Sequence, residues 1–239
     1  AYESALKGFV EAMLDHKASF IQTFWDAVQP FVVAGALNSF SQTVLKLAAP
    51  GVPDIYQGTE FYDFSLVDPD NRREVDFDAR IAALGEEVAP AELLADWRSG
   101  RLKAHLTRAG IRLRAEAPET FTKGDYLPLT VEGPMARHVV AFARIGEGGG
   151  AAIAIVPRLT LTLLDGQAMP TIASERWAET EIRLPEALSA TSWRNVLTGA
   201  RIGGGTLTLS DVFADLLQLL ALFILRDAQL VSGVLQGLL

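Results

Sequence analysis

Polar side chains suited to binding a sugar are concentrated between positions 54 and 78. Tyr56, Gln57 and Glu60 follow a short apolar run, and Gly58 allows the chain to turn directly after it. An aromatic face suits a pyranose ring, whereas amide and carboxylate groups suit its hydroxyls. We therefore expect these residues to contact a substrate: Asp54, Tyr56, Gln57, Glu60, Asp68, Asp70, Asn71, Arg72 and Arg73.

The charged half of this segment has a second interpretation. Asp68, Asp70, Arg72 and Arg73 can equally pair with one another and fix a loop without touching any ligand. Spacing alone does not separate the two interpretations. If the loop does bind a substrate, we expect Tyr56 and Arg72 to make the most direct contacts.

Helices are expected to position this loop. Apolar residues recur at spacings of three and four over 6–14, 20–31 and 36–47, which predicts three helices that bury one face each. Pro30 should kink or end the second, and Pro50 with Gly51 should stop the third. Residues 52–56 are too few for a helix and predict one buried strand. Further helical patterns lie at 79–84, 91–97 and 102–115.

Short β-prone runs replace the helical patterns after Pro118. Turn signals, including glycine triplets at 148–150 and 203–205, separate several of them, which predicts an antiparallel sandwich of about 90 residues. Trp177 and Trp193 could form an exposed aromatic surface, although tryptophans in sandwiches are more often buried. The predicted strands are 126–131, 138–144, 151–156, 159–164, 180–184, 193–197 and 206–209.

Composition excludes several classes of function. The 239 residues include 21 basic and 29 acidic ones, and the net charge of −8 disfavours nucleic acid and anionic membranes as partners. The chain has no cysteine, and its three histidines lie far apart, so we expect no metal site and no cofactor. Because the chain opens with Ala1 and no secretory signal follows, we expect a piece of a longer cytoplasmic protein.

Several motifs resemble one enzyme family. Gly51-x-Pro53-x-x-Tyr56-x-Gly58-x-Glu60 resembles the eighth strand of the barrel in the α-amylase superfamily, glycoside hydrolase family 13. The resemblance narrows to the maltooligosyl trehalose synthases and covers roughly residues 2–215, which match only the C-terminal third of that family's usual length. The stretches that carry it are 36–43, 45–46, 49–60 and 63–73, with 124–129, 141–144, 156–158 and 193–199 in the region that resembles the family's β-domain.

The resemblance implies a fold and a domain organisation. It implies an α+β chain in which residues 1–120 are the last helices and eighth strand of a (β/α)8 TIM barrel, with an active-site loop at 57–78. Residues 121–215 then form an antiparallel β-sandwich C-terminal domain. An apolar tail of unclear role occupies 216–239, and its first ten residues are too short to span a bilayer and predict a buried terminal helix.

The resemblance also implies a reaction on maltooligosaccharide. The family converts the reducing-end α-1,4 bond into the α,α-1,1 bond of trehalose through a retaining mechanism with two carboxyl groups. Those groups follow earlier barrel strands, so we expect them outside this chain and assign no catalytic residue here. Glu60 matches a strand-eight glutamate that is not one of them. The missing N-terminal barrel portion is therefore the expected partner.

Two other functions fit the same residues. One is a carbohydrate-binding or structural module without chemistry, which exposed aromatics on a β-sheet face would favour. The other is a fragment of a different α-amylase-superfamily glucanase, against which the run Val-Asp-Pro-Asp-Asn-Arg-Arg at 67–73 argues. A barrel fragment with a single strand leaves backbone groups unpaired, so we expect residues 1–117 to be poorly ordered, aggregating or dimeric without the missing strands.

Overall fold

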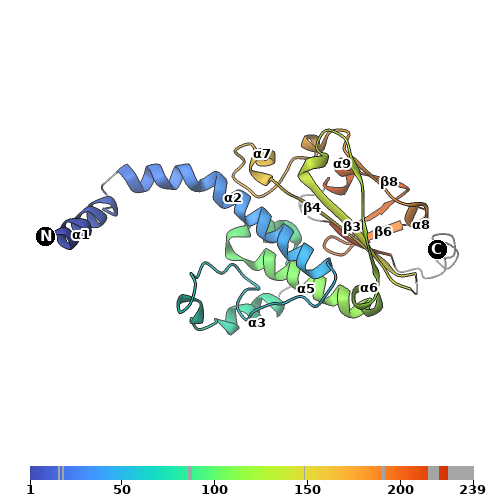
Figure 1. Cartoon of the computed structure of the whole chain (residues 1–239), viewed down its shortest axis with the longest axis horizontal. Helices are drawn as coiled ribbons and strands as arrows, with labels where there is room; N and C mark the ends of the chain where they lie inside the picture. The colour runs from blue at the N-terminus through green and yellow to red at the C-terminus, as the bar shows by residue number, and fades with distance from the viewer. Residues whose placement is uncertain are drawn as a thin grey trace.

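The computed structural model describes residues 1–15, 17, 19–85, 88–147, 149–189, 192–214 and 221–225 (Figure 1). Its first half is helical, and its second half holds two antiparallel sheets. The helices are α1 (Tyr2–Met13), α2 (Ser19–Ala48), α3 (Phe77–Gly85), α4 (Pro90–Ala95), α5 (Arg101–Glu116), α6 (Pro118–Thr122), α7 (Thr160–Leu164), α8 (Glu186–Ser189) and α9 (Leu209–Val212), with short 3-10 turns at 70–72, 97–99, 136–138 and 174–177. The strands are β1 (Asp125–Pro128), β2 (Val131–Glu132), β3 (Val139–Ile145), β4 (Ala151–Pro157), β5 (Glu181–Arg183), β6 (Ser192–Asn195), β7 (Arg201–Gly203), β8 (Thr206–Thr208) and β9 (Ala221–Leu225).

Two of the predicted helices are one continuous helix. α2 runs through 30 residues and contains Pro30, so a helix end at this proline, one of the two predicted outcomes, is wrong. Proline removes one hydrogen bond from the preceding turn. The carbonyl that loses its donor belongs to Asp26, which is exposed, so water can satisfy it.

The predicted strand at 52–56 is absent from the structure. These residues are irregular, and Val52 is 92% exposed, so the prediction of a buried strand is wrong for this chain. A parallel strand needs a hydrogen-bonded neighbour, and all the strand pairs in the described residues lie beyond position 124. The segment therefore has no sheet to join.

The larger sheet has six strands in the order β1-β3-β4-β9-β6-β7, and the smaller has three in the order β2-β5-β8. Six of the seven predicted runs contain or overlap a strand, whereas β7 was not predicted. The run 159–164 is a further error, because it forms α7. Thr160 Oγ1 donates to the carbonyl of Ala34 at 3.2 Å, and this hydrogen bond attaches α7 to α2. The run was predicted as a strand because a short apolar run does not by itself distinguish a helix from a strand.

The apolar tail contributes a central strand. β9 pairs antiparallel with both β4 and β6, so the prediction of a terminal helix is wrong at 221–225. A strand with a neighbour on each side can be a continuous apolar run, which explains why the periodicity was ambiguous. The rest of the tail, 215–220 and 226–239, lies outside the described residues.

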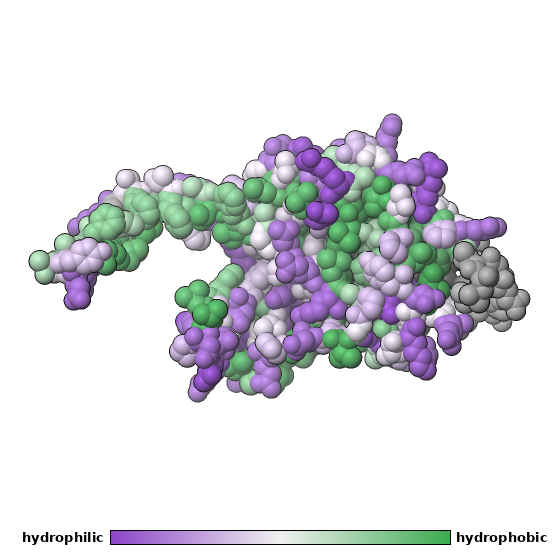
Figure 2. Space-filling view, viewed as in Figure 1, coloured by the Kyte–Doolittle hydropathy of each residue, from purple (hydrophilic) through white to green (hydrophobic). Residues whose placement is uncertain are grey.

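The N-terminal helices extend away from the rest of the molecule (Figure 1). No residue of α1 is buried, and the buried residues of α2 begin at Val33. Large apolar side chains are exposed along this arm, and Figure 2 shows them as a hydrophobic surface: Tyr2, Leu6, Phe9, Val10, Leu14, Phe20, Phe24, Trp25, Phe31 and Val32. Among the described residues, no helix is both long enough and apolar enough to cross a membrane.

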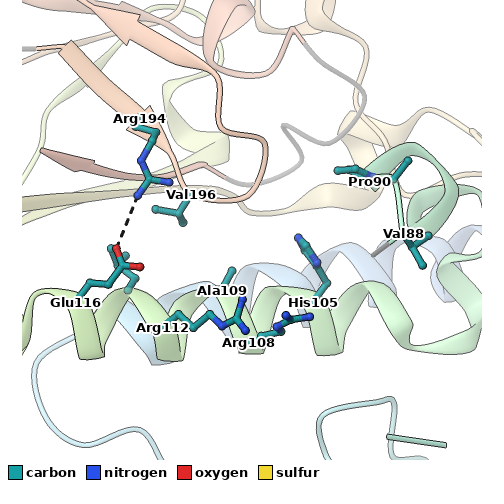
Figure 3. Close-up of a pocket in the computed structure, with 11 residues that line it drawn as sticks. Val88, Pro90, His105, Arg108, Ala109, Arg112, Glu116, Arg194 and Val196 are labelled. Atoms are coloured by element: carbon teal, nitrogen blue, oxygen red, sulfur yellow. Dashed lines mark ion pairs between the residues drawn. The ribbon is translucent and has the colours of Figure 1, made fainter. Parts of the chain in front are cut away.

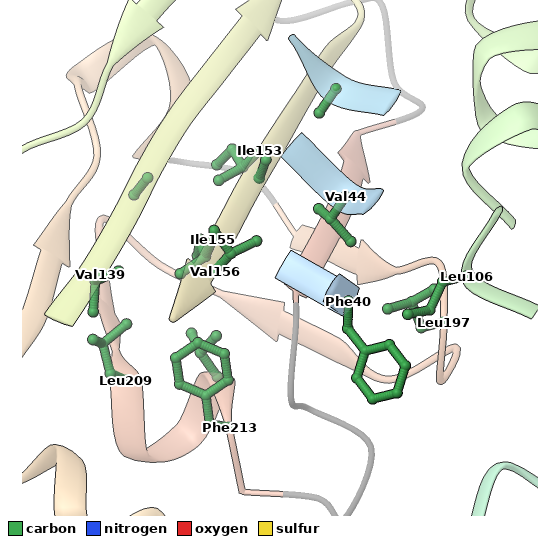
Figure 4. Packing of buried hydrophobic residues seen from close by; sticks show 14 of the residues in the cluster. Phe40, Val44, Leu106, Val139, Ile153, Ile155, Val156, Leu197, Leu209 and Phe213 are labelled. Carbon is green, nitrogen blue, oxygen red and sulfur yellow. The ribbon is translucent and has the colours of Figure 1, made fainter. Parts of the chain in front are cut away.

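The C-terminal half of α2 packs on the larger sheet. Phe40 and Val44 belong to the same buried cluster as Ile153 and Ile155 of β4 (Figure 4). Ser41 Oγ donates to the carbonyl of Pro157 at 2.9 Å across this contact. One hydrophobic core therefore joins the helical half to the β half, because the cluster reaches from α2 into α9 and Phe213.

A buried arginine strengthens the same junction. Arg144 on β3 is 2% exposed and donates to the carbonyl of Gly124 at 2.7 Å and to that of Phe121 at 3.3 Å. Its Nη1 lies 3.4 Å from the carbonyl of Ala48, the last residue of α2. Arg144 therefore ties the β half to the C-terminal end of α2, from which the chain leads into the loop at 54–73.

Candidate functional site

The loop leaves α2 at a point held by a second arginine. Arg114 of α5 donates to the carbonyl of Leu47 at 2.9 Å and to the carbonyl of Gly51 at 2.8 Å. The Leu47 carbonyl belongs to the last turn of α2, where carbonyl groups have no partner within the helix. Gly51 has a φ of +106°, which suits glycine and redirects the chain at this point. The start of the loop is therefore fixed.

A tight turn presents Tyr56 to solvent. Thr59 donates its backbone N–H to the Tyr56 carbonyl at 3.1 Å, and the N–H of Gly58 donates to Glu60 Oε2 at 2.9 Å. Gly58 has a φ of +93°, as the turn requires. The Tyr56 side chain is 72% exposed, and Gln57 beside it is also exposed.

Arg80, which was not predicted, organises this turn from α3. Its Nε lies 3.3 Å from Glu60 Oε2, and its Nη2 donates to the carbonyl of Gly58 at 2.5 Å. Its Nη1 also donates to the carbonyl of Asp76 at 2.8 Å, and its guanidinium lies 4.8 Å from the centre of the Phe61 ring. Glu60 therefore stabilises the loop through Arg80. The spacing of 20 residues between them gave no signal in the sequence.

The charged residues of the loop pair with one another. Arg72 Nε lies 2.5 Å from Asp68 Oδ1, and Arg73 forms an ion pair with Asp70. Asp70 also accepts the backbone N–H of Leu66 at 2.7 Å. That hydrogen bond is the main cause that holds the pKa of Asp70 below its usual range, and the contact with Arg73 is the second cause. The internal pairing that the sequence left open is therefore formed.

Four of the predicted residues have side chains without a partner among the described residues. The side chains of Asp54, Tyr56, Gln57 and Asn71 are exposed and make no hydrogen bond or ion pair with another described residue. The other five are engaged in the contacts with Arg80, Asp68 and Asp70 given above. The structure thus separates the predicted residues into an internally paired set and a set whose polar groups remain available.

Two further residues missed by the sequence reasoning lie where the loop meets the core. Tyr62 has a buried hydroxyl without a hydrogen-bond partner among the described residues, and burial raises its pKa well above the usual value. Its ring lies 6.1 Å from that of Phe40 and 5.8 Å from that of Phe64. Lys103 of α5 donates to the carbonyl of Phe61 at 3.0 Å, and burial lowers its pKa. These contacts attach the loop to α2 and α5.

Glu60 also lies at the edge of a groove between α3 and α5. The groove has a volume of about 550 Å³, and most of its lining is apolar. Phe77, Ile81 and Ile111 line it, and each is about half exposed or more. A groove of this kind, next to the loop, is a surface that another part of a protein could cover.

Comparison with known proteins identifies the relatives of this chain. No protein-family model matches it. A protein of Mycobacterium tuberculosis that carries the name maltooligosyl trehalose synthase is 34% identical over 222 residues, which make up 90% of this chain and 24% of that protein.

Solved structures give the same result. The maltooligosyltrehalose synthase of Arthrobacter ramosus matches 88% of this chain with a TM-score of 0.68 and 33% identity, over 25% of its own length. A mutant of the same enzyme matches 94% of this chain with a TM-score of 0.72 and 32% identity, over 27% of its own length. The chain thus spans about a quarter of the length of the relatives it matches. The resemblance inferred from its motifs is confirmed: over nine-tenths of its length, this chain is similar to a C-terminal portion of the maltooligosyl trehalose synthases.

Proposed function

We propose that this chain is the C-terminal part of a cytoplasmic (1→4)-α-D-glucan 1-α-D-glucosylmutase, which needs no cofactor. Such an enzyme converts the reducing-end α-1,4 bond of a maltooligosaccharide into the α,α-1,1 bond of trehalose by intramolecular transglycosylation. The observation that carries the proposal is the 34% identity to a maltooligosyl trehalose synthase over nine-tenths of the chain. The catalytic carboxyl groups belong to the remaining part of the enzyme.

In this proposal the loop at 54–73 binds the sugar. Tyr56 supplies an aromatic face, and Asp54, Gln57 and Asn71 supply hydrogen-bonding groups that no described residue occupies. Arg72 and its neighbours fix the shape of the loop through their ion pairs and retain donors for a sugar hydroxyl. In the complete enzyme, these loop residues would help to hold the released glucose until it is attached again to the oligosaccharide.

The exposed apolar surfaces support a missing partner. The arm formed by α1 and the first half of α2 leaves Phe9, Phe24 and Phe31 more than half exposed. A soluble protein rarely exposes so many large apolar side chains together unless another surface covers them. We propose that residues 1–120 are the end of a (β/α)8 barrel, whose N-terminal portion covers the arm and pairs with residues 52–56.

The alternative of a glucan-binding module receives less support. Such a module would use aromatic side chains on an open sheet face, and both candidate tryptophans are fully buried. Trp177 stacks on Phe213 with ring centres 4.6 Å apart, which makes it part of the core. The loop, and not the sheets, is therefore the proposed sugar-binding element.

The proposal is tested by reconstitution. The chain is incubated with maltopentaose, alone and together with the N-terminal part of the relative from Mycobacterium tuberculosis that this chain does not match. Reducing ends should disappear only in the mixture, and Tyr56→Ala should lower this rate by about tenfold, equivalent to ~1.4 kcal/mol. The control variant Tyr126→Ala, at an exposed position of β1 outside both the loop and the arm, should lower it less. Loss of reducing ends with the chain alone would place a complete active site here and contradict the proposal.

A further inference from the structure

A second cavity separates α5 from the strand β6 (Figure 3). Its volume is about 550 Å³, within the range of small-molecule sites. One wall is α5, the opposite wall carries Arg194 and Val196, and one end is closed by residues 88–90. None of its lining residues belongs to the loop at 54–73, so it is a site separate from the proposed sugar loop.

Positive charge is concentrated in this cavity. Arg108 and Arg112 are four residues apart on α5 and therefore lie on the same face of the helix, and Arg194 faces them from β6. Glu116 is the one acidic residue among the described residues of the lining. The described lining therefore has a local excess of positive charge, although the net charge of the whole chain is −8.

The arginines retain donors for a ligand. Arg194 Nη2 forms an ion pair with Glu116 Oε2 at 3.9 Å, a distance too long for a hydrogen bond (Figure 3). Arg108 uses Nη1 on the carbonyl of Leu84 at 3.0 Å, and Arg112 makes no hydrogen bond or ion pair with any other residue that the structure describes. A guanidinium has five N–H donors, so most of these donors are open to the cavity or to solvent.

A half-buried histidine adds an unpartnered polar atom to the same cavity. His105 lies one turn before Arg108 and Ala109 on α5, and its ring points into the space below β6 (Figure 3). Its Nε2 atom is buried and has no hydrogen-bond partner among the described residues. Burial lowers the pKa of His105, a backbone hydrogen bond with Leu197 opposes this shift, and Arg108 adds to it. A bound anion would raise the pKa of His105 again and would accept a hydrogen bond from Nε2.

We propose that this cavity binds a small phosphorylated molecule, with its phosphate between Arg112 and Arg194 and within reach of His105. One guanidinium group can donate to two phosphate oxygens at once, and this contact gives both affinity and orientation. The volume exceeds what a phosphate ion needs, and Val88, Pro90 and Val196 give the remainder of the cavity apolar walls for the body of the ligand. The site does not depend on the proposed transglycosylation.

The test is titration calorimetry on the chain, with glucose 6-phosphate, inorganic phosphate and glucose as the three probes. Glucose 6-phosphate should bind and glucose should not. Arg112→Gln and Arg194→Gln should each weaken binding by about tenfold, the usual loss for a charge-assisted hydrogen bond. Arg158→Gln, a change of equal charge outside the cavity, should leave the affinity unchanged. Inorganic phosphate binding as tightly as the sugar phosphate would support the site and identify free phosphate as its ligand.

Three results would overturn the proposal. They are the absence of heat with both anions at millimolar concentration, equal binding of glucose, and unchanged affinity in both arginine variants. Melting temperatures of all variants are measured in parallel, so that a loss of binding is not confused with a loss of folding. A second readout is the imidazole signal of His105 in NMR spectra, which should shift on adding glucose 6-phosphate and should not shift on adding glucose.

Discussion

Arg80 Nε lies 3.3 Å from Oε2 of Glu60, so a residue on α3 holds the turn that presents Tyr56. The same guanidinium also binds the carbonyl groups of Gly58 and Asp76. One side chain therefore connects both ends of the loop. Glu60, which was predicted from the sequence to contact the substrate, therefore forms an ion pair within the protein.

Replacing Arg80 should loosen the loop without unfolding the protein. The ion pair is partly exposed, so Arg80→Met should cost only about 1 kcal/mol of global stability, while two backbone carbonyl groups lose their donor. Limited proteolysis should cut between 56 and 76 several-fold faster than in the unaltered chain. Arg158→Met is the control, and equal cleavage rates in both variants would show that Arg80 does not hold the loop.

The contact between α2 and α5 depends on a glycine. A Cβ atom on Gly110 would lie 2.6 Å from Cδ1 and 3.1 Å from Cβ of the buried Leu47. Gly110→Ala should therefore lower the free energy of unfolding by ~1–3 kcal/mol, measured by urea denaturation. Gly35→Ala on the exposed face of α2 meets nothing within 4 Å and should be neutral or stabilising by up to ~1 kcal/mol. The same loss in both variants would contradict close packing at Gly110.

Stability should fall as the pH falls below neutrality. Burial lowers the pKa of His105 below its unfolded value of about 6.5, so the unfolded chain binds more protons in this range. The stabilisation is complete above the unfolded pKa and is lost as the pH drops toward the folded one. The melting temperature should decline as the pH is lowered through about 6.5, and that of His105→Gln should decline less. Parallel pH profiles would exclude His105 as the cause.

The exposed arm should make the isolated chain self-associate. Phe24 and Trp25 are both more than half exposed and lie outside the buried core. Phe24→Ser together with Trp25→Ser should shift the chain toward a monomer in light scattering after size exclusion, with an unchanged melting temperature. Gln22→Ser, on an exposed position of the same helix, is the control. A monomeric unaltered chain at high concentration would contradict an uncovered apolar surface.

Local patterns predicted the parts of this fold that depend on local interactions. The helical periodicity at 36–47 and 102–115 reflects faces buried within the chain, and the hairpin of β3 and β4 closes over a short turn. The predicted strand at 52–56 did not form because no strand in the described residues lies beside it. The strand β9 was missed because an apolar run carries no period that distinguishes strand from helix.

The candidate site was predicted in residue type but not in organisation. The sequence identified Tyr56 and the charged run at 68–73, yet it could not show that Asp68 and Asp70 are already paired. Arg80 and Arg114 were missed because their roles arise from contacts between segments 20 and 63 residues apart. Contacts of that kind are set by the tertiary fold and leave no spacing pattern.

The most direct measurement is the proton NMR spectrum of maltopentaose treated with this chain and the complementary N-terminal portion together. We expect the reducing-end anomeric signals to decline while an α,α-1,1 signal grows, with little free glucose released. A glucanase would instead generate new reducing ends and free short sugars. That second result, or an unchanged spectrum from a mixture shown to form a complex, would contradict the proposal that this chain completes a trehalose-forming enzyme.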